Sequence, residues 1–385
     1  MRILTAHNYY LEPGGEDEVF RSESRLLEER GHAVLRHTAD NRHALRMSRI
    51  EAAAAAVWNR AAGRELRSLV AQHSPDLVHF HNTFPLLSPA CYQAARAGGA
   101  AVVQTLHNYR VVCPGALLAR DATPCESCLG RPLAWPGILH GCYRGSRAAT
   151  AALAAMTAVH RAAGTWNDAV DVYVALTAFA RARFVEGGLP AAKIVVKPNF
   201  VWPDPGAGPG AGGYVLFAGR LSREKGLGTL AGAWKLLNGM PPLKAAGDGP
   251  MAAELEGVPG VAALGRRTRE DVLALMRGAS FLVFPSLCYE GLPLAVLEAF
   301  ACGLPVIASR LGAMAEVIEE GRTGLLFTPG DAGDLAAKVE WAAAHPDELG
   351  RMRREARAEF EARYTAERNY QALMEVYARA RSRRN

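Results

Sequence analysis

Two glutamates beside a predicted helix start can bind the hydroxyl groups of a ligand. In the segment YEGLPLAVLEAFACGLPVIAS, residues 289–309, a helix is predicted to begin near Leu294, after a strand that ends at Pro285. Glu290 lies on the loop before the helix, and Glu298 lies eight positions later on the helix itself. A helix N-terminus offers unpaired amides and the positive end of a dipole, which favours phosphate. Carboxylates at this place would accept hydrogen bonds from sugar or ribose hydroxyls, although two isolated glutamates would ordinarily be surface residues.

Two cations follow an earlier strand in the same half of the chain. Arg220 and Lys225 come after the predicted strand Tyr214 to Ala218. Fixed cations at such a place can neutralise the charge that develops on a leaving diphosphate. A lone basic residue on a loop is usually only solvated. Because both residues are expected to face the same cleft as the Glu290 loop, we interpret them as ligand-binding.

The first half of the chain supplies a small-residue turn. The sequence LEPGGEDEVF places Gly14 and Gly15 between the first strand and a helix expected to begin near Glu16. Residues without bulky side chains let the backbone approach a phosphate closely. Glu16, Asp17 and Glu18 follow, and these acidic groups would repel phosphate unless they point away and merely favour the helix start. A plain turn is the alternative interpretation.

Three histidines lie on or just after predicted strands. In VVQTLHNYR, His107 immediately follows a strand that is expected to be buried. In DLVHFHN, His79 and His81 alternate along another strand, so one can belong to the core while the other faces a cleft. Neither of these two histidines is assigned a role from the sequence.

The pattern around the two glutamates resembles that of a known enzyme family. Glu290, Glu298 and their neighbours resemble the E-x7-E signature of the retaining glycosyltransferases of family four, which have the GT-B fold. Three further segments also resemble family segments: FAGRLSREKGLGTL the phosphate-binding segment, AAGDGP (residues 245–250) a glycine-containing loop, and GAMAEVIEEGRTGLLFTPGD the closing segment. The resemblance covers nearly all of residues 214–332.

The resemblance implies roles for individual residues. Glu290 would contact the donor sugar, Glu298 would bind the ribose of the nucleotide, and His107 would reach the donor sugar from the first domain. The residues expected to act in catalysis are His107, Arg220, Lys225 and Glu290. The residues expected to bind the donor are Gly14, Gly15, Asn199, Gly219, Gly247, Gly249, Gly291, Leu292, Pro293, Leu294 and Glu298. The expected donor is a uridine or guanosine diphosphate sugar.

The family resemblance also implies a mechanism. In this family, retention of the anomeric configuration is ascribed to front-face attack, in which the departing phosphate takes the proton of the acceptor hydroxyl. No enzymatic nucleophile, catalytic metal or other cofactor is then required, and the sequence has no DxD motif on a strand end to hold a divalent cation. Catalysis would consist of positioning and charge stabilisation, with domain closure over the donor.

Four of the seven cysteines fall within one insertion that follows His107. Cys125 and Cys128 form a C-x2-C pair, flanked by Cys113 and Cys142. This spacing is compatible with a structural zinc ion held by four thiolates. His140 could replace one ligand, and scattered free thiols are the other alternative, because disulfides are not expected in a cytosolic protein. The insertion, residues 113–142, is expected to shape the acceptor side.

Strands that alternate with longer helical stretches predict an α/β protein with parallel sheets. The chain has 385 residues, of which 50% are hydrophobic, and this length suggests about two domains. Expected strands in the first half are residues 2–7, 33–38, 77–81, 101–106, 172–177 and 194–197. Expected strands in the second half are residues 214–218, 243–246, 261–264, 281–285, 305–309 and 324–327.

These elements predict two Rossmann-like domains of the GT-B type with a cleft between them. We expect an acceptor-binding domain over residues 1–200 and a donor-binding domain over residues 201–362. The Gly- and Pro-rich stretch 198–213 is interpreted as an interdomain linker. Residues 347–383 are expected to form one or two amphipathic helices, with residues 363–385 packing back on the first domain.

The net charge of +6 is unevenly distributed along the chain. Residues 1–200 contain 22 basic and 16 acidic residues, residues 201–350 contain 12 and 17, and residues 351–385 contain 10 and 5. Both ends of the chain are therefore basic. One candidate face comprises Arg42, Arg46, Arg49, Arg60, Arg64 and Arg67. Such a face is either simply solvated or docks at an anionic membrane or a phosphate-bearing acceptor.

The expected location is the cytoplasm, with peripheral contact at the inner face of the membrane. No run approaches the about 18 uninterrupted apolar residues of a membrane span, and the N-terminus MRILTAHNYY lacks the pattern of a signal peptide. The expected partners are a nucleotide sugar and a glycan, lipid-linked or small-molecule acceptor. Nucleic acid is not an expected partner.

Other classes of protein were weighed against a glycosyltransferase that helps to build polysaccharides. One is a non-catalytic nucleotide-sugar-binding protein, against which the joint presence of both glutamates, both cations and His107 argues. Another is a nucleotide-sugar epimerase or a phosphorylase on the same fold, although no pyridoxal-lysine segment is found for the latter. A nicotinamide dehydrogenase is disfavoured because no G-x-G-x-x-G opens a helix after either first strand.

Overall fold

The computed structural model describes residues 1–12 and 14–384, which divide into two compact units. The first unit comprises residues 1–118, 125–198 and 369–385. The second comprises residues 119–124 and 199–368. The change of unit after residue 198 comes two residues before the expected domain boundary. The return to the first unit comes at residue 369, six residues after the expected position.

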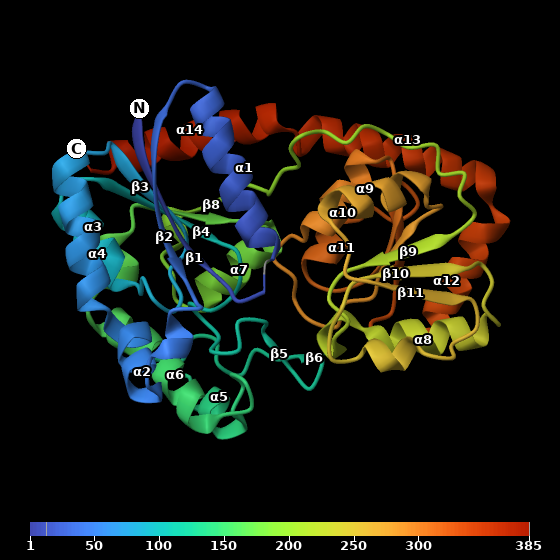
Figure 1. Ribbon diagram of the computed structural model, residues 1–385, viewed down its shortest axis with the longest axis horizontal. Coiled ribbons are helices and arrows are strands. Elements are labelled where there is room, and N and C mark those ends of the chain that lie inside the picture. Colours follow the sequence, from blue (N-terminus) through green and yellow to red (C-terminus); the bar gives the residue numbers. More distant parts are fainter. Residues whose placement is uncertain (13, 385) are drawn as a thin grey trace. The chain divides into compact units, whose positions relative to one another are not determined.

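The first unit contains a six-stranded parallel sheet with the strand order β2-β1-β3-β4-β7-β8. Helices lie on both sides of this sheet (Figure 1). Its strands are β1 (Arg2–Tyr9), β2 (Ala33–Asp40), β3 (Leu77–Asn82), β4 (Ala101–Leu106), β7 (Val172–Ala175) and β8 (Ile194–Val196). Its helices are α1 (Gly15–Glu29), η1 (Ala44–Arg46), α2 (Arg49–Trp58), α3 (Arg60–His73), α4 (Ala90–Ala97), α5 (Trp135–His140), α6 (Arg147–Ala162), η2 (Thr165–Ala169), α7 (Ala178–Glu186) and η3 (Ala191–Lys193), with most of α14 (Ala366–Ser382).

The second unit contains another six-stranded parallel sheet, with the order β11-β10-β9-β12-β13-β14. Its strands are β9 (Val215–Ala218), β10 (Leu243–Ala246), β11 (Val261–Gly265), β12 (Leu282–Phe284), β13 (Val306–Ser309) and β14 (Gly324–Phe327), and the short pair β5 (Ala119–Arg120) and β6 (Thr123–Pro124) also belongs to this unit. Its helices are η4 (Arg223–Lys225), α8 (Leu227–Leu236), η5 (Ala252–Leu255), α9 (Arg269–Gly278), α10 (Leu294–Ala301), α11 (Ala313–Val317), α12 (Ala332–Ala344) and α13 (Pro346–Arg363).

All twelve expected strands are present, and the prediction of a two-domain α/β fold is confirmed. Central strands such as β3, β4 and β12 are buried along their whole length. Continuous apolar runs of this kind are typical of parallel strands that are covered by helices on both faces. The short apolar runs therefore located the sheets from sequence alone.

Helix α14 completes the core of the first unit. Leu373, Val376 and Tyr377 pack with Ile3 of β1 and Leu77 of β3 in one cluster of buried side chains. Figure 1 shows this helix in red along the first unit. The expected amphipathic tail thus forms two helices, α13 and α14, which contribute to different units.

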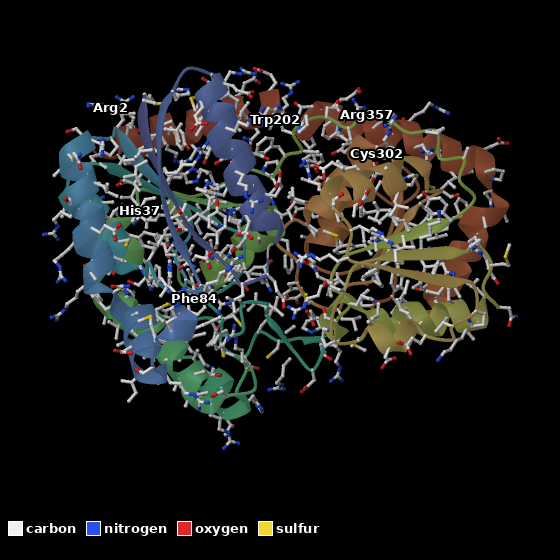
Figure 2. All side chains as sticks on the ribbon, viewed as in Figure 1. Arg2, His37, Phe84, Trp202, Cys302 and Arg357 are labelled. Carbon is white, nitrogen blue, oxygen red and sulfur yellow. The ribbon has the colours of Figure 1, made fainter. Side chains whose placement is uncertain are left out.

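The Gly- and Pro-rich stretch begins at the change of unit, as expected for an interdomain connection, and it is hydrogen-bonded to the second unit. The backbone N–H groups of Gly208, Gly210 and Gly212 donate to the carbonyls of Cys302, Arg277 and Gly278 at 2.8–3.0 Å. Arg357 adds hydrogen bonds of 2.7 Å to Asp204 at the start of the same stretch. Figure 2 labels Trp202, Cys302 and Arg357 in this part of the second unit. Backbone and side-chain hydrogen bonds therefore hold the stretch on the second unit.

None of the helices in the described part of the chain combines the length and the apolar character that a membrane span requires.

Candidate functional site

In the second unit, the predicted site residues gather where the order of the strands reverses. Numbered by position along the chain within the unit, the sheet has the order 3-2-1-4-5-6, so the reversal lies between β9 and β12. Open parallel sheets bind ligands at the carboxyl ends of the strands beside such a switch point. The loop after β9 carries Arg220 and Lys225, and the loop after β12 carries Glu290. Both loops therefore belong to the edge of the sheet where a ligand is expected.

Lys225 and Glu290 form a close ion pair at this edge. The Lys225 Nζ donates to Glu290 Oε1 at 2.6 Å, and the hydroxyl of Ser286 donates to the same oxygen at 2.6 Å. The two side chains are 25% and 14% exposed. The loops after β9 and β12 are joined further, because Leu287 N–H donates to the Glu224 carbonyl at 2.8 Å. The structure thus brings together two residues that lie 65 positions apart in the sequence.

The ion pair affects the pKa of Lys225 itself and the pKa of the nearby Cys288. Burial disfavours the charge of Lys225, but Glu290, together with Cys288 and Glu224, raises the pKa of Lys225 above its ordinary value. Burial, and then the Glu290 carboxylate, raises the pKa of Cys288 to about 12. Lys225 is therefore a fixed cation and Cys288 a neutral thiol at physiological pH. A permanent cation at this place suits the charge of a phosphate group.

Glu298 lies on α10 and is paired with an arginine that the sequence did not indicate. Arg269 Nε donates to Glu298 Oε1 at 2.7 Å, and Arg269 also reaches the Trp202 carbonyl at 3.3 Å. Arg269 is the first residue of α9, directly after the Thr268 N-cap, whose hydroxyl accepts from Asp271 N–H. The capping sequence T-R-E-D signals this helix start, but only the packing of α9 beside α10 reveals the partner of Glu298.

The glycine loop after β10 lies against the loop after β9 through backbone contacts. Gly219 N–H donates to the Ala246 carbonyl at 3.0 Å, and Leu221 N–H donates to the Asp248 carbonyl at 2.7 Å. Gly247 has φ +153°, and a Cβ atom on it would lie 1.8 Å from the Gly219 carbonyl oxygen; a Cβ atom on Gly249 would lie 2.4 Å from that of Leu221. Only glycine allows this close approach, so both glycines are required by the fold of the site.

Asn199 forms a hydrogen bond with the loop that carries Glu290. Its side-chain amide donates to the Leu292 carbonyl at 3.0 Å, and both residues are buried. Gly291 and Pro293 flank Leu292 and are partly buried, and Pro293 is the N-cap of α10, which begins at Leu294 as predicted. The side-chain oxygen of Asn199 is buried with no hydrogen-bond partner in the described part of the chain.

Arg220 differs from Lys225 in its surroundings. It lies two residues after β9 and is exposed, whereas Lys225 is partly buried in the turn η4, seven residues after the strand. Both cations follow β9, as expected from the sequence. The short helical turn between β9 and α8 carries the Lys225 side chain to Glu290.

In the first unit, the glycine turn begins α1 one residue earlier than expected. Gly14 is the N-cap and Gly15 the first helical residue. Asp17 turns inward: its carboxylate accepts from Gly14 N–H at 2.9 Å and contacts His7 Nε2 at 2.7 Å. Asn108 Nδ2 donates to Glu16 at 3.2 Å. These two acidic groups are therefore engaged within the protein, as their cap positions require.

His107 directly follows β4, as predicted, and its ring is held by a second histidine. The two rings stack with centroids 5.3 Å apart, and His107 Nε2 lies 3.1 Å from His81 Nδ1. His81 Nε2 lies 3.3 Å from Glu23 Oε1. With the His81 proton on Nε2, where the carboxylate stabilises it, Nδ1 accepts from His107 Nε2–H. Burial, and then the nearby His81 and His7, lower the pKa of His107, so its ring is neutral.

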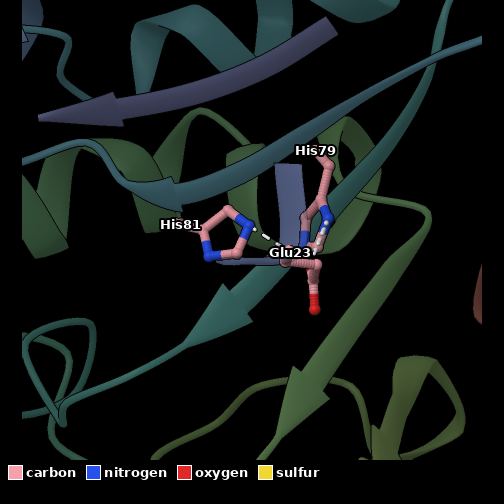
Figure 3. A group of neighbouring side chains, drawn as sticks. All are labelled: Glu23, His79 and His81. Atoms are coloured by element: carbon pink, nitrogen blue, oxygen red, sulfur yellow. Dashed lines mark ion pairs between the residues drawn. The ribbon is translucent and has the colours of Figure 1, made fainter. Parts of the chain in front are cut away.

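His79 and His81 are both buried, and His81 is among the residues that line a pocket with His107. Figure 3 shows how Glu23 of α1 lies beside both rings. Glu23 Oε1 is 3.3 Å from His79 Nδ1, and Glu23 Oε2 accepts from the Lys197 ammonium at 3.1 Å. Although burial opposes ionisation, Lys197 and the two histidines hold the pKa of Glu23 well below its ordinary value. Lys197 also donates to Asn369 at 2.5 Å, which ties the network to α14.

Glu23, His79 and His81 form the one group in the described residues whose ligand atoms lie within 4.8 Å of one another, the spacing of a metal site. Other contacts disfavour a metal there. The Lys197 ammonium beside Glu23 would repel a cation. His79 uses Nδ1 for Tyr377 and Nε2 for Thr105, each at 2.8 Å. We therefore interpret the group as a buried ion-pair network.

The four cysteines of the insertion belong to the first unit, and three of them lie beside Gly115 or Gly137. A Cβ atom on Gly115 would be 3.8 Å from Cys113 Sγ and 3.6 Å from Cys142 Cβ, and one on Gly137 would be 3.4 Å from Cys128 Sγ. No three of their sulfurs are within 4.8 Å of one another in the described structure. Burial, and then the other three thiols, raises the pKa of Cys128 to about 11, although the Gly137 backbone opposes it. All seven cysteines are free. The zinc site stays a prediction.

The residues that the sequence interpretation missed are buried charges within apolar patterns. Glu23 stands on the buried face of α1, three positions after Phe20 and four before Leu27. A single carboxylate within such a stripe is a signal that it has a buried partner. Lys197, directly after β8, is that partner. The sequence shows it as a charged residue that directly follows the apolar run of this strand.

Comparisons with known proteins agree with this arrangement. Residues 13–204 match the family model described as Glycosyltransferase Family 4, and residues 212–345 match the one described as Glycosyl transferases group 1. An uncharacterized glycosyltransferase from Methanocaldococcus jannaschii is 31% identical over 168 residues, covering 42% of this chain and 47% of that protein. The D-rhamnosyltransferase WbpZ from Pseudomonas aeruginosa is 33% identical over 162 residues, covering 40% and 42%. The matches thus span less than half the length of these relatives.

A solved structure shares the fold. The protein HepE from Anabaena, crystallised in complex with UDP, superposes with a TM-score of 0.69 at 16% identity, covering 98% of this chain and 100% of that one. The similarity confirms the expected GT-B architecture of two Rossmann-like domains.

Proposed function

Because the chain belongs to glycosyltransferase family 4, we propose that it transfers a sugar from a nucleotide-sugar donor to a hydroxyl group of an acceptor, with retention of the anomeric configuration. The acceptor classes that we propose are a glycan, a lipid-linked glycan or a small molecule. The observation that carries the proposal is the ion pair of Lys225 and Glu290 on the two loops that flank the switch point of the second sheet.

The paired residues suggest how the donor is handled. Lys225 is a permanent cation, so it can neutralise charge on the β-phosphate as the glycosidic bond breaks. Glu290 is held by two donors on one oxygen, which fixes the carboxylate for contact with sugar hydroxyls. Glu298, oriented by Arg269, accepts from the ribose. The leaving phosphate takes the acceptor proton, so no protein group is required as a nucleophile.

The nucleoside of the donor is proposed to be uridine or guanosine. HepE, which shares the fold, was crystallised with UDP, and WbpZ is named as a rhamnosyltransferase. Gly219, Gly247 and Gly249 lie in the loops where the phosphates are proposed to bind, and the exposed Arg220 is proposed to contact the diphosphate. From the first unit, His107 with its neutral ring is proposed to contact the donor sugar.

Replacing Glu290 by Gln tests the proposal. The substitution keeps the shape but removes the charge, so turnover should fall by roughly 100-fold or more, as for the loss of one preorganised polar contact in an active site. Release of nucleoside diphosphate from a panel of UDP- and GDP-sugars, followed by mass spectrometry, is the measurement. Glu256→Gln, at an exposed position of the same unit, is the matched control and should turn over normally.

The same assay separates the alternatives. Near-normal turnover by Glu290→Gln contradicts the assignment of this site. Binding of a nucleotide sugar by the wild type without any turnover favours a non-catalytic binding protein, and conversion of the donor sugar without release of nucleoside diphosphate favours an epimerase. A product with inverted anomeric configuration, seen by NMR, contradicts retention.

A further inference from the structure

Two segments of the first unit carry a marked excess of positive charge. Residues 42–67 contain six arginines against Glu51 and Glu65. Residues 127–167 contain four arginines and no acidic residue. Both segments belong to the first unit, so they can be described together. The positive charge of the first half of the chain is thus concentrated in particular helices.

The arginines at the start of the first segment face solvent and have few carboxylate partners in the described structure. Arg46 and Arg49 are exposed, and neither forms an ion pair with any residue that the structure describes. Arg42 is also exposed, and its nearest carboxylate, that of Asp40, lies 3.9 Å away. The acidic Glu51 is occupied in the capping box of α2, where it accepts from Ser48 N–H at 2.8 Å. The cations are therefore available to an external anion.

Large apolar side chains are exposed among these arginines. Ile50 is 82% exposed and Leu45 is 68% exposed, the former at the second residue of α2 and the latter in η1. In the second segment, Trp135 and Leu139 of α5 are each 52% exposed and Leu133 is 44% exposed. Single exposed apolar residues are common, but five in two short basic segments indicate a surface that is covered in function.

Helices from both basic segments pack against helix α6. Helices α2 and α5 both pack against α6, and Figure 1 shows the three helices together in the lower part of the first unit. Ala56 of α2 packs with Leu153 and Met156 of α6 in a core that includes Phe84, labelled in Figure 2. Arg144 and Arg147 are exposed. Arg144 lies between α5 and α6, and Arg147 is the first residue of α6. The arginines of α3 lie on a helix that packs against α4 instead.

We propose that this docking surface, made of Arg42, Leu45, Arg46, Arg49, Ile50, Leu133, Trp135, Leu139, Arg144 and Arg147, binds the surface of an anionic lipid membrane. The apolar side chains enter the interface between head groups and acyl chains, where tryptophan is favoured. The arginines remain at the level of the phosphates, and each such cation adds attraction to anionic lipid. Neither part alone gives stable attachment, whereas the two together do.

Co-sedimentation with vesicles tests the proposal. The full chain should bind phosphatidylglycerol vesicles, bind phosphatidylcholine vesicles much more weakly, and be released as salt is raised, because salt screens the charges. The double variant Arg46→Glu/Arg49→Glu should bind phosphatidylglycerol vesicles at least about tenfold more weakly. Ile50→Ser should also weaken binding, without removing the salt dependence, since it deletes an apolar anchor and no charge.

Matched controls keep charge and hydrophobicity separate from position. Lys235→Glu/Arg354→Glu makes the same change of charge at exposed sites of the second unit, and Leu236→Ser removes an exposed leucine there; both should bind vesicles like the wild type. The proposal is overturned if the wild type binds both vesicle types equally or neither, or if the control and test variants bind alike. It is also overturned if light scattering shows that the surface is covered by a second copy of the chain.

Discussion

At the residue scale, a carboxyl group beside the proposed sugar site is held in its neutral form. Glu16 accepts from the side-chain amide of Asn108, the residue after His107, at 3.2 Å. Burial, and then the adjacent Asp17 carboxylate, raises the pKa of Glu16 from 4.5 to about 8. At neutral pH the group therefore carries a proton, which explains how an acidic residue can occupy a glycine turn that is proposed to meet phosphate.

Glu16→Gln should change the pH dependence of stability. Between pH 4.5 and about 8 the unfolded chain has lost the Glu16 proton while the folded chain retains it, so the wild-type free energy of unfolding falls as pH rises through this window. Glutamine cannot titrate, so the variant should gain stability relative to the wild type with rising pH. Urea unfolding at several pH values measures this difference. Parallel pH profiles for the two proteins would contradict the raised pKa.

Glu23 is predicted to support the first unit and, through His81, the ring of His107. Glu23→Gln leaves the Lys197 ammonium buried without its anionic partner, at 3% side-chain exposure. Removing one partner of a buried pair costs about 3–5 kcal/mol of the free energy of unfolding. Replacing both partners, in Glu23→Gln/Lys197→Met, should recover part of this loss.

Denaturant unfolding checks this prediction against a surface pair. Glu29→Gln breaks the exposed pair with Arg25 and should cost less than about 1 kcal/mol. If Glu23→Gln were as stable as Glu29→Gln, the buried network would not contribute as we infer. A loss of turnover that exceeds the loss of stability would further indicate that Glu23 positions His107.

At the element scale, the cysteine insertion has little core of its own. Between β4 and α6 its regular structure consists of the two-residue strands β5 and β6 and the six-residue helix α5. Small segments of this kind commonly depend on a metal ion or a disulfide, and all the cysteines are free. This is the physical ground for the zinc prediction, because a zinc ion would draw the four sulfurs together.

Elemental analysis of the purified full chain tests for zinc. We expect one zinc per chain, and the double variant Cys125→Ser/Cys128→Ser should lose it, since two of four thiolates are removed. Cys91→Ser, at a buried cysteine outside the insertion, is the control and should retain the metal. Absence of stoichiometric zinc from the wild-type protein would remove the hypothesis.

Helix α14 belongs largely to the first unit, although the other elements of that unit lie far from it in the sequence. Its amphipathic pattern predicts one buried face, and Leu373 and Tyr377 occupy that face. Tyr377 reaches His79 with a hydrogen bond of 2.8 Å, and Asn369 meets Lys197. The same helix therefore closes a hydrophobic core and supplies polar partners to the buried network around Glu23.

At the scale of the whole molecule, two sheets of similar size arise from one repeated pattern with different strand orders. The first unit has the order 2-1-3-4-5-6 and the second has 3-2-1-4-5-6 when strands are numbered within each unit. In each six-stranded sheet, the strand order reverses beside the strand that comes first in the sequence. The glycine turn follows β1, and Lys225 follows β9, so the proposed ligand-binding loops occupy corresponding places in the two units.

The sequence by itself determined the strands and the two-domain class, and it singled out Glu290, Glu298, Lys225 and His107 as candidate site residues. These features depend on local periodicity and on short motifs, which the order of residues records directly. It also indicated the uneven charge. It located the connection between the units at residues 198–213, but it did not show the backbone hydrogen bonds that hold this stretch on the second unit, because composition does not record them.

Only the tertiary structure decided which charged groups are partners. Lys225 with Glu290, Arg269 with Glu298 and Lys197 with Glu23 are separated by 65, 29 and 174 positions. A pattern of burial can show that a charge requires a partner, but the choice of partner depends on which elements pack together. Exposure was decided in the same way: Ile50 and Trp135 read as ordinary apolar residues in the sequence, and the packing of α2 and α5 on α6 leaves them in solvent.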